Sequence, residues 1–372
     1  MNPRVSFVVP CYRLAHLLKE CVDSILAQTF GDLEVLIMDD CSPDDTPQIA
    51  KSFTDPRVRH IRNDPNLGHL RNYNKGIFLA RGQFIWLISA DDRLRRPYIV
   101  ERYVDFMDRH PAAGFAFCPG MGLEDGNETS LLRYSYHGDK DQLFPGPQFF
   151  IKLLKSNSVL AASGMVRRDV YEKLGMFPLN MPFGGDWYLW LLFALHYDVA
   201  YLAEPMVHYR QHAQSMTNVL NEEDPRICTK DDLRVLWQIK RRAEEAQCME
   251  LASLVDDFIV DRATLFLASV RNNGPRPWYT FEDFEGSVIE NAPSEEERRR
   301  IRSRVYSRVA DEIFWLRNYS LSNELYQRSL KLQFFQPKVW LQWLLLQAGR
   351  PGIRLREAQL ALRRWVADSK SH

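Results

Sequence analysis

Short strand-like runs alternate with helix-like segments along the first 120 residues of the chain. The strand-like runs are residues 5–10, 33–38, 58–61, 84–88 and 114–118. Between them, apolar residues recur three or four positions apart, as at Leu18, Cys21 and Ile25, which is helical spacing. Strands separated by helices of this length predict βαβ units, so the fold class is α/β with a mostly parallel central sheet.

The pattern is less regular between residues 119 and 219. Residues 119–145 mix glycine, aspartate and asparagine with alternating apolar positions, which predicts a loop with a short hairpin. Further on, residues 159–166 read as a strand and residues 186–195 as a helix with an aromatic and leucine face. These elements complete a predicted first domain over residues 1–219.

Helical patterns dominate after about residue 220. Ser294 with Glu297 is typical of a capping box at a helix start. Short helices are predicted at residues 312–317, 322–332, 337–348 and 352–366, without a clean repeat period. The sequence therefore predicts an all-α second domain over residues 220–372.

Composition narrows the class of protein. The 372 residues are 45% hydrophobic, as in globular proteins, and no apolar run is long enough to span a membrane. The N-terminus enters a strand almost at once, so no signal peptide is expected. Six cysteines without a C-x-x-C spacing favour reduced thiols, and hence a cytoplasmic location.

The zero net charge conceals an asymmetry along the chain. From residue 298 to the end there are 16 Lys and Arg against 5 Asp and Glu, a net charge of +11, which leaves −11 for the rest. Such a distribution indicates either a partner of one sign or a helical domain with a solvated basic face.

Acidic residues follow two of the predicted strands. Asp39-Asp40 comes after residues 33–38, and Asp91-Asp92 after residues 84–88. Because ligands of open α/β sheets bind at the carboxyl ends of strands, the first pair suits a nucleotide and the second a divalent cation. The alternatives are a helix N-cap cluster for the first pair and a polar loop for the second.

Two further clusters carry candidate chemistry. Asp186 lies between a Gly-Gly turn and an aromatic helix, where partial desolvation would make it a better base, although a helix N-cap is the alternative. Arg210 and His212 lie in a segment that ends a strand, where they could meet phosphate or a metal.

The order and spacing of these motifs resemble the family 2 inverting glycosyltransferases of GT-A fold, over about residues 3–217. The series comprises Tyr12, Gln28-Thr29, Asp39-Asp40-x-Ser42, Gly68, Ala80-Arg81-Gly82, Ala90-Asp91-Asp92, Gly185-Asp186-x-x-Leu189-Trp190 and Tyr209-Arg210-x-His212-x-x-Ser215.

The resemblance implies a role for each matching residue. Asp186 would be the catalytic base. Nucleotide binding would involve Pro10, Tyr12, Asp40, Arg71, Asp91 and Arg210. Mn²⁺ or Mg²⁺ would be held by Asp91, Asp92 and His212.

Two positions depart from the family pattern. Arg13 stands where Asn is common, and Ser89 stands where the usual Asp-x-Asp has its first carboxylate. The second departure leaves open whether Asp91 or Asp92 holds the metal.

The resemblance implies transfer of a hexosyl or N-acetylhexosaminyl group, with UDP as the family's commonest nucleotide. The acceptor would be a saccharide or lipid-linked saccharide in bacterial surface polysaccharide or glycoconjugate synthesis, and no nucleic-acid partner is expected. The alternatives are a nucleotide-sugar binding protein without activity and a sugar nucleotidyltransferase. The latter usually has a Gly-rich basic loop after its first strand, where this chain has residues 11–16.

The C-terminal helices combine basic charge with aromatic residues, namely Trp315, Phe334, Phe335, Trp340, Trp343 and Trp365. This combination suits an anionic membrane surface, so we expect a peripheral position on the inner face of the cell membrane. A protein docking or homo-oligomerisation module is the competing interpretation.

Overall fold

The computed structural model describes residues 2–223, 226–268 and 280–358. Its contacts divide the chain into two compact units. The first comprises Met1–Asp231 and Arg241–Ala252, and the second comprises Asp232–Lys240 and Ser253–His372. The division expected after residue 219 is close to the first of these boundaries and stays a prediction of functional domains.

Within the described residues, the first unit carries an eight-stranded sheet. Its strands are β1 (Val5–Cys11), β2 (Leu33–Asp39), β3 (Val58–Arg62), β4 (Phe84–Leu87), β6 (Ala113–Phe117), β9 (Gln142–Phe144), β10 (Met165–Arg167) and β11 (Asp198–Tyr201). They lie in the order β3-β2-β1-β4-β10-β6-β11-β9. The pairs β3–β2, β2–β1, β1–β4 and β6–β11 are parallel, whereas β10 and β9 run antiparallel to their neighbours. The predicted mostly parallel sheet is confirmed.

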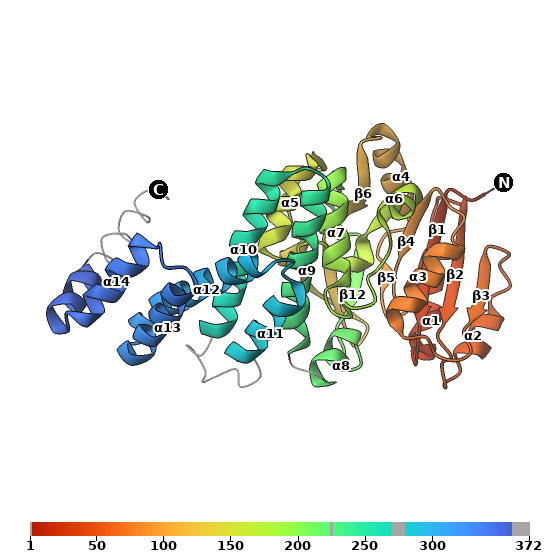
Figure 1. Ribbon diagram of the computed structural model, residues 1–372. Coiled ribbons are helices and arrows are strands. Elements are labelled where there is room, and N and C mark those ends of the chain that lie inside the picture. Colours follow the sequence, from red (N-terminus) through yellow and green to blue (C-terminus); the bar gives the residue numbers. More distant parts are fainter. Residues whose placement is uncertain (1, 224–225, 269–279, 359–372) are drawn as a thin grey trace. The chain divides into compact units, whose positions relative to one another are not determined.

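Helices cover both faces of the parallel part of this sheet. Those of the first 223 residues are α1 (Ala15–Leu26), α2 (Thr46–Ser52), α3 (His69–Leu79), α4 (Ile99–Arg109), α5 (Gly146–Lys155), α6 (Arg168–Leu174), α7 (Gly185–His196) and α8 (Met216–Glu223). Figure 1 shows β1, β2 and β3 side by side with α1, α2 and α3 against them.

Burial on both faces explains why β1, β2 and β4 are almost entirely apolar. Phe7 and Val9 of β1 belong to the core that includes residues of α1 and α4. Val8 points to the opposite face, where α3 packs so closely that a Cβ on Gly76 would lie 2.4 Å from Val8 Cγ1. A parallel sheet buried on both faces requires such continuous apolar runs.

The strand predicted at residues 159–166 is wrong in its extent. A 3-10 turn, η2 (Ala161–Ser163), occupies its centre, and only the short β10 pairs with the sheet. The carbonyl of Ala162 accepts a hydrogen bond from the indole N–H of Trp86 (2.8 Å), which satisfies the backbone away from the sheet. An apolar run alone does not distinguish such a buried turn from a strand.

A smaller sheet contains β5 (Arg93–Leu94), β12 (Val207–Arg210), β7 (Gly120–Glu124) and β8 (Asn127–Leu131), in that order. The β7–β8 pair is the hairpin predicted within residues 119–145, and the 3-10 turn η1 (Arg133–Ser135) follows it. Because β12 pairs with β5, it brings residues after 207 beside the segment that follows β4.

The described residues from 227 onward are helical. The elements are α9 (Ile227–Glu245), α10 (Met249–Ala268), α11 (Phe281–Asn291), α12 (Glu295–Trp315), α13 (Tyr319–Leu332) and α14 (Pro337–Gln347), and residues 350–358 are also helical. The rest of the helix predicted at 352–366, with Trp365, lies outside the described residues. Among the described helices, none combines the length and the hydrophobicity needed to cross a membrane.

The separate helix predicted at residues 312–317 is wrong, because α12 continues through Trp315. The buried positions Val305, Val309 and Ile313 prolong one helical stripe along it. At its start, Ser294 accepts a hydrogen bond from the N–H of Glu297 (3.1 Å), which is the N-cap half of the predicted capping box.

Candidate active site

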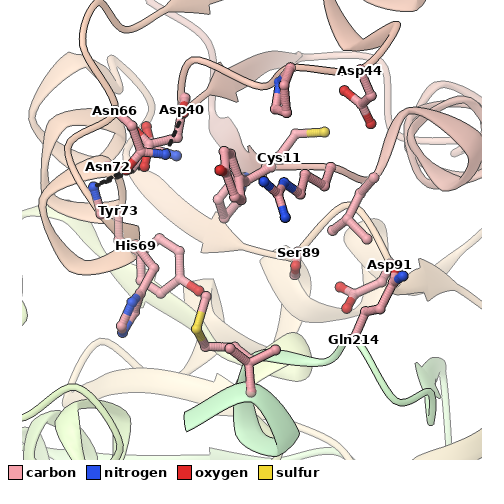
Figure 2. Close-up of a pocket in the computed structure, with 18 of the residues that line it drawn as sticks. Cys11, Asp40, Asp44, Asn66, His69, Asn72, Tyr73, Ser89, Asp91 and Gln214 are labelled. Atoms are coloured by element: carbon pink, nitrogen blue, oxygen red, sulfur yellow. Dashed lines mark hydrogen bonds between the residues drawn. The ribbon is translucent and has the colours of Figure 1, made fainter. Parts of the chain in front are cut away.

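A cavity of about 850 Å³ lies at the carboxyl ends of β1, β2 and β4. Its polar and charged lining residues include Tyr12, Arg13, Asp40, Asp44, Asn66, Asn72, Ser89, Asp91 and Gln214. Figure 2 shows Asp40, Asn66 and Asn72 on one side of this cavity and Asp91 with Gln214 on the other. This is the edge at which parallel α/β sheets bind ligands.

Asp40 organises one wall of the large cavity. Its carboxylate accepts hydrogen bonds from the backbone N–H groups of Leu67 (2.8 Å) and Gly68 (3.0 Å) and from Asn63 Nδ2 (2.8 Å). Gly68 has a φ of +80°, in the left-handed region that favours glycine. The carboxylate therefore holds the loop that precedes α3 in a defined shape, and it keeps lone pairs for a ligand.

The neighbouring Asp39 does not line the large cavity. It is fully buried and accepts hydrogen bonds from Arg62 Nη1 (2.6 Å) and the N–H of Ser42 (2.8 Å), with His60 Nε2 at 3.1 Å. Because His60 and Arg62 belong to β3, Asp39 ties β2 to its neighbour.

Pro10, Tyr12 and Arg13 line the same cavity at the end of β1. Tyr12 is 40% exposed, and the Arg13 guanidinium lies 5.2 Å from the centre of its ring. Arg13 has a φ of +58°, a backbone conformation that Asn adopts more readily than Arg. Among the described lining residues of this cavity, Arg13 is the one Lys or Arg.

Asp91 combines burial with an unsatisfied oxygen. Its Oδ2 lies 3.0 Å from His212 Nε2, whereas its buried Oδ1 has no hydrogen-bond partner in the described structure. Burial works against ionisation, but hydrogen bonds with His212 and Ser89 outweigh it and hold the pKa of Asp91 below its usual value.

A divalent cation would fit this free oxygen. Among the described residues there is no cluster of three His, Cys, Asp or Glu able to hold a metal. Asp91 and His212, which are in contact, could supply two protein ligands. Mg²⁺ commonly completes its shell with water and substrate phosphates.

Asp92 has a different environment from Asp91. Its Oδ1 accepts the backbone N–H of Arg210 (2.9 Å), and burial together with the charge of Asp91 raises the pKa of Asp92 well above its usual range. The guanidinium of Arg210 donates to the Asp91 carbonyl (2.9 Å) and to Glu20 (2.6 Å). Asp92 and Arg210 thus hold β12 against the segment that follows β4.

Asp186 lines a second cavity of about 190 Å³. It lies in the first turn of α7, whose N-cap is Gly184, so the N-cap alternative for Asp186 is wrong. Its carboxylate accepts hydrogen bonds from the N–H of Trp187 (2.7 Å) and from Asn157 Nδ2 (3.0 Å). Burial raises the pKa of Asp186, and these two hydrogen bonds lower it only in part.

The two cavities share several lining residues: His69, Tyr73, Ser89, Asp91, Met216 and Leu220. Asp186 shares the lining of the smaller one with six aromatic residues, namely Tyr73, Tyr171, Phe177, Phe183, Trp190 and Tyr209. A ligand in the large cavity and a second molecule beside Asp186 would therefore meet near Asp91.

The structure does not bring every predicted residue to the cavities. Arg71 is exposed on α3, and Arg71, Arg210 and His212 are all absent from the lining of both cavities, although His212 contacts Asp91, which lines both. Conversely, the sequence offered no signal for Asn157, which lies 29 residues from its partner Asp186, or for Tyr73. Both reach the site through packing of elements that are distant in the sequence.

Known proteins resemble this chain in sequence. An uncharacterized glycosyltransferase of Rickettsia typhi is 26% identical over 270 residues, which cover 71% of this chain and 80% of that protein. The succinoglycan biosynthesis protein ExoO of Rhizobium meliloti is 39% identical over 112 residues, covering 30% of this chain and 31% of ExoO.

Solved structures share the fold. The crystal structure of S. aureus TarS residues 1–349 with UDP superposes with a TM-score of 0.58 at 17% identity, covering 89% of this chain and 91% of that one. The corresponding complex with UDP-GlcNAc has a TM-score of 0.59 at 16% identity, covering 89% and 92%.

A match to a family profile covers most strands of the eight-stranded sheet. Residues 6–175 match the profile of Glycosyl transferase family 2. The chain therefore carries a family 2 glycosyltransferase domain, followed by a helical C-terminal region.

Proposed function

We propose that this chain transfers a sugar from a UDP-sugar to an acceptor hydroxyl with inversion at the anomeric carbon. The observation that carries the proposal is the junction of the two cavities. The large one has the size of a ligand site, and it shares Ser89 and Asp91 with the small one that contains Asp186. The TarS complexes with UDP and UDP-GlcNAc support this type of donor.

We assign the nucleotide to the wall formed by Pro10, Tyr12 and Asp40. Tyr12 offers an exposed ring for stacking on the base, and Asp40 offers acceptor oxygens. Arg13 would supply positive charge for the diphosphate, since it is the one Lys or Arg among the described residues that line the large cavity. Arg71 and Arg210 would act on the nucleotide only indirectly, because their side chains do not line the cavity.

We assign the metal to Asp91 and His212 rather than to Asp92. A Mn²⁺ or Mg²⁺ ion bound there would offset negative charge on the leaving diphosphate. Asp92 would support the site by holding the backbone of Arg210, two residues before His212.

Asp186 acts as general base in this mechanism. Its carboxylate removes the proton from the acceptor hydroxyl while that oxygen bonds to the anomeric carbon, and the bond to the nucleoside diphosphate breaks. Hydrogen bonds from Asn157 and from the N–H of Trp187 orient the carboxylate. A single displacement inverts the configuration at the anomeric carbon.

The small cavity favours an uncharged acceptor group. Among its described lining residues none is Lys or Arg, whereas Asp91, Asp92 and Asp186 are acidic. A phosphate next to the attacked hydroxyl would be repelled, and the aromatic walls suit the C–H face of a sugar ring. We therefore propose a saccharide acceptor, free or lipid-linked, in cytoplasmic polysaccharide or glycoconjugate synthesis, for which ExoO offers a precedent by name.

A nucleotide-sugar binding protein without activity is the second candidate. It is favoured by Ser89, which lines both cavities at the position of the family's usual first carboxylate. Donor hydrolysis measured without acceptor separates the two candidates, since a binding protein would release no UDP above the background rate.

Two substitutions test the proposal. Asp186→Asn should reduce turnover of a UDP-sugar about 10²–10⁴-fold, while UDP affinity by calorimetry changes less than about threefold. Asp91→Asn should abolish the gain in UDP affinity on adding Mn²⁺. Asp105→Asn, at an exposed position of α4, is the control and should change neither quantity.

Near-normal turnover of Asp186→Asn would remove Asp186 from the mechanism. An unchanged Mn²⁺ effect in Asp91→Asn would exclude the metal site without contradicting the role of Asp186.

A further inference from the structure

Helix α14 is apolar all around, yet Leu341 and Leu344 are exposed and its other apolar side chains are only half-buried. Seven of its 11 residues are apolar, and its buried side chain is that of Gln342. In the segment that precedes it, Phe334 is 71% exposed and Phe335 is 92% exposed. We call the exposed residues Phe334, Phe335, Leu341, Leu344 and Leu355 the α14 surface. A surface of this kind marks an interaction site.

The aromatic residues of this region are held in place. The ring of Phe334 lies 5.2 Å from that of Trp340, which lies 5.4 Å from the ring of Trp343. The indole N–H of Trp340 donates a hydrogen bond to the Phe334 carbonyl (2.8 Å). The exposed ring of Phe334 is thus held in place and has less side-chain entropy to lose on docking.

The basic charge of the second unit divides into paired and unpaired groups. Along α12, Arg300 pairs with Asp256, Arg302 with Glu285, and Arg304 with Asp257. In contrast, Lys331, Lys338, Arg350 and Arg354 are exposed and form no ion pair with another described residue.

These four unpaired cations flank the α14 surface. Lys331 precedes Phe334 by three residues, and Lys338 follows Phe335 by three residues. Residues 331–358 contain one acidic residue, Glu357. These four cations are therefore close in sequence to the exposed apolar side chains, and little acidic charge lies among them.

We propose that the α14 surface docks on an anionic lipid membrane, with the helix lying among the headgroups. An 11-residue helix is about 16 Å long, too short to cross a bilayer core of about 30 Å. Exposed Phe and Leu side chains would enter the acyl boundary, while the four cations meet anionic headgroups. This interaction does not depend on the activity proposed above.

Charge favours a lipid surface over a second copy of the chain. In a two-fold dimer the same patch faces itself, so four unpaired cations would face four others. Such like-charge contacts oppose association, whereas an anionic bilayer attracts all four groups.

Vesicle co-sedimentation of the full chain tests the proposal. At low salt the chain should bind vesicles of phosphatidylcholine with 30% phosphatidylglycerol at least about tenfold more tightly than pure phosphatidylcholine, and 0.5 M NaCl should remove most of that difference. Lys331→Gln with Lys338→Gln should weaken binding about 25-fold, since each cation near the surface contributes about fivefold.

Phe334→Ser with Phe335→Ser should weaken binding about tenfold or more through lost apolar contact. Phe78→Ser is the matched control, because Phe78 is 79% exposed on α3 and lies outside the α14 surface. All variants should keep the melting temperature of the parent chain within about 2 °C, since the replaced side chains are exposed.

Three results would overturn the proposal. The first is equal binding to neutral and anionic vesicles at low salt, and the second is an equal loss of binding in Phe78→Ser. The third is a dimer, detected by light scattering, that Phe334→Ser with Phe335→Ser dissociates. That result would assign the α14 surface to a second copy.

Discussion

Neighbouring carboxylates in this chain have opposite environments. Asp40 faces the large cavity while Asp39 is enclosed between β2 and β3, and Asp91 carries an unpaired oxygen while Asp92 holds the backbone of Arg210. Within each pair, one carboxylate keeps oxygens available to a ligand and the other secures a strand end, although Asp92 also lines the small cavity.

Arg13→Asn should stabilise the fold and weaken UDP binding. Asn tolerates the φ of +58° better than Arg, so the free energy of unfolding should rise by about 0.5–1 kcal/mol, measured by urea denaturation. Arg13 is the one Lys or Arg among the described lining residues of the large cavity, so its replacement should weaken UDP binding about tenfold.

Arg71→Asn is the comparison for this variant. Its position on α3 outside the cavity predicts a change in UDP affinity below about twofold, and a larger loss would reinstate Arg71 as a nucleotide ligand.

The half-buried Asp186 predicts the acidic limb of the pH profile. Burial raises the pKa of Asp186, and a base works only when deprotonated, so kcat/KM should fall as the pH decreases through that raised value. Asn157→Ala removes a hydrogen bond to the charged form and should move this limb to higher pH, in rates measured between pH 4.5 and 8. A limb at the same pH in both proteins would show that another group controls it.

At the scale of elements, burial decided which predictions from the sequence succeeded. The strands β1, β2 and β4 were predictable because a sheet covered on both faces favours nearly continuous apolar runs. The run at residues 159–166 was equally apolar but folds as η2 and β10. The Ala162 carbonyl in η2 accepts a hydrogen bond from the indole N–H of Trp86 instead of from a neighbouring strand. The sequence did not predict the full length of α12, because polar residues interrupt the row of apolar residues that it buries.

Glu34 of β2 links β1 to the segment between α3 and β4 and should contribute to stability. Its carboxylate accepts hydrogen bonds from Ser6 Oγ (2.7 Å) of β1 and from the Arg81 N–H (2.9 Å) and Nη2 (2.8 Å). Glu34→Gln should lower the free energy of unfolding by about 1–2 kcal/mol at pH 7. Asp23→Asn, which breaks an exposed pair with Lys19, should cost less than about 0.5 kcal/mol.

The effect of Glu34→Gln should also depend on pH. Burial opposes ionisation of Glu34, but hydrogen bonds from Arg81 and Ser6 outweigh it and lower its pKa. The contribution is therefore complete above the pKa of an unfolded glutamate and disappears as the pH falls through the lowered folded-state pKa. The two unfolding curves should converge below about pH 4, and a constant difference down to pH 3 would exclude this linkage.

At the scale of the whole molecule, the charge asymmetry has a structural explanation. The arginines of α12 pair with acidic residues that precede residue 298, so much of the +11 charge is compensated within the second unit. All described residues that line the two cavities belong to the first unit. The candidate chemistry and the four cations near the α14 surface therefore belong to different units.

Lys240 allows this separation of roles to be tested. It is buried with Asp256 (3.3 Å) and Glu297 in the second unit. Lys240→Met leaves two carboxylates close together, so the free energy of unfolding should fall by about 3 kcal/mol, while UDP affinity at 20 °C stays unchanged. Arg299→Met, which removes an exposed pair with Glu295, should cost less than about 0.5 kcal/mol.

The sequence by itself determined the parallel sheet, the helical C-terminal region and the positions of the acidic residues at strand ends. Apolar runs and helical spacing are local, and they are read without knowledge of the fold. Only the tertiary structure decided that Asp91 has a free oxygen, that Asn157 supports Asp186 and that the cations around α14 are unpaired. Each of these depends on contacts between elements far apart in the sequence, where no local pattern specifies the partner.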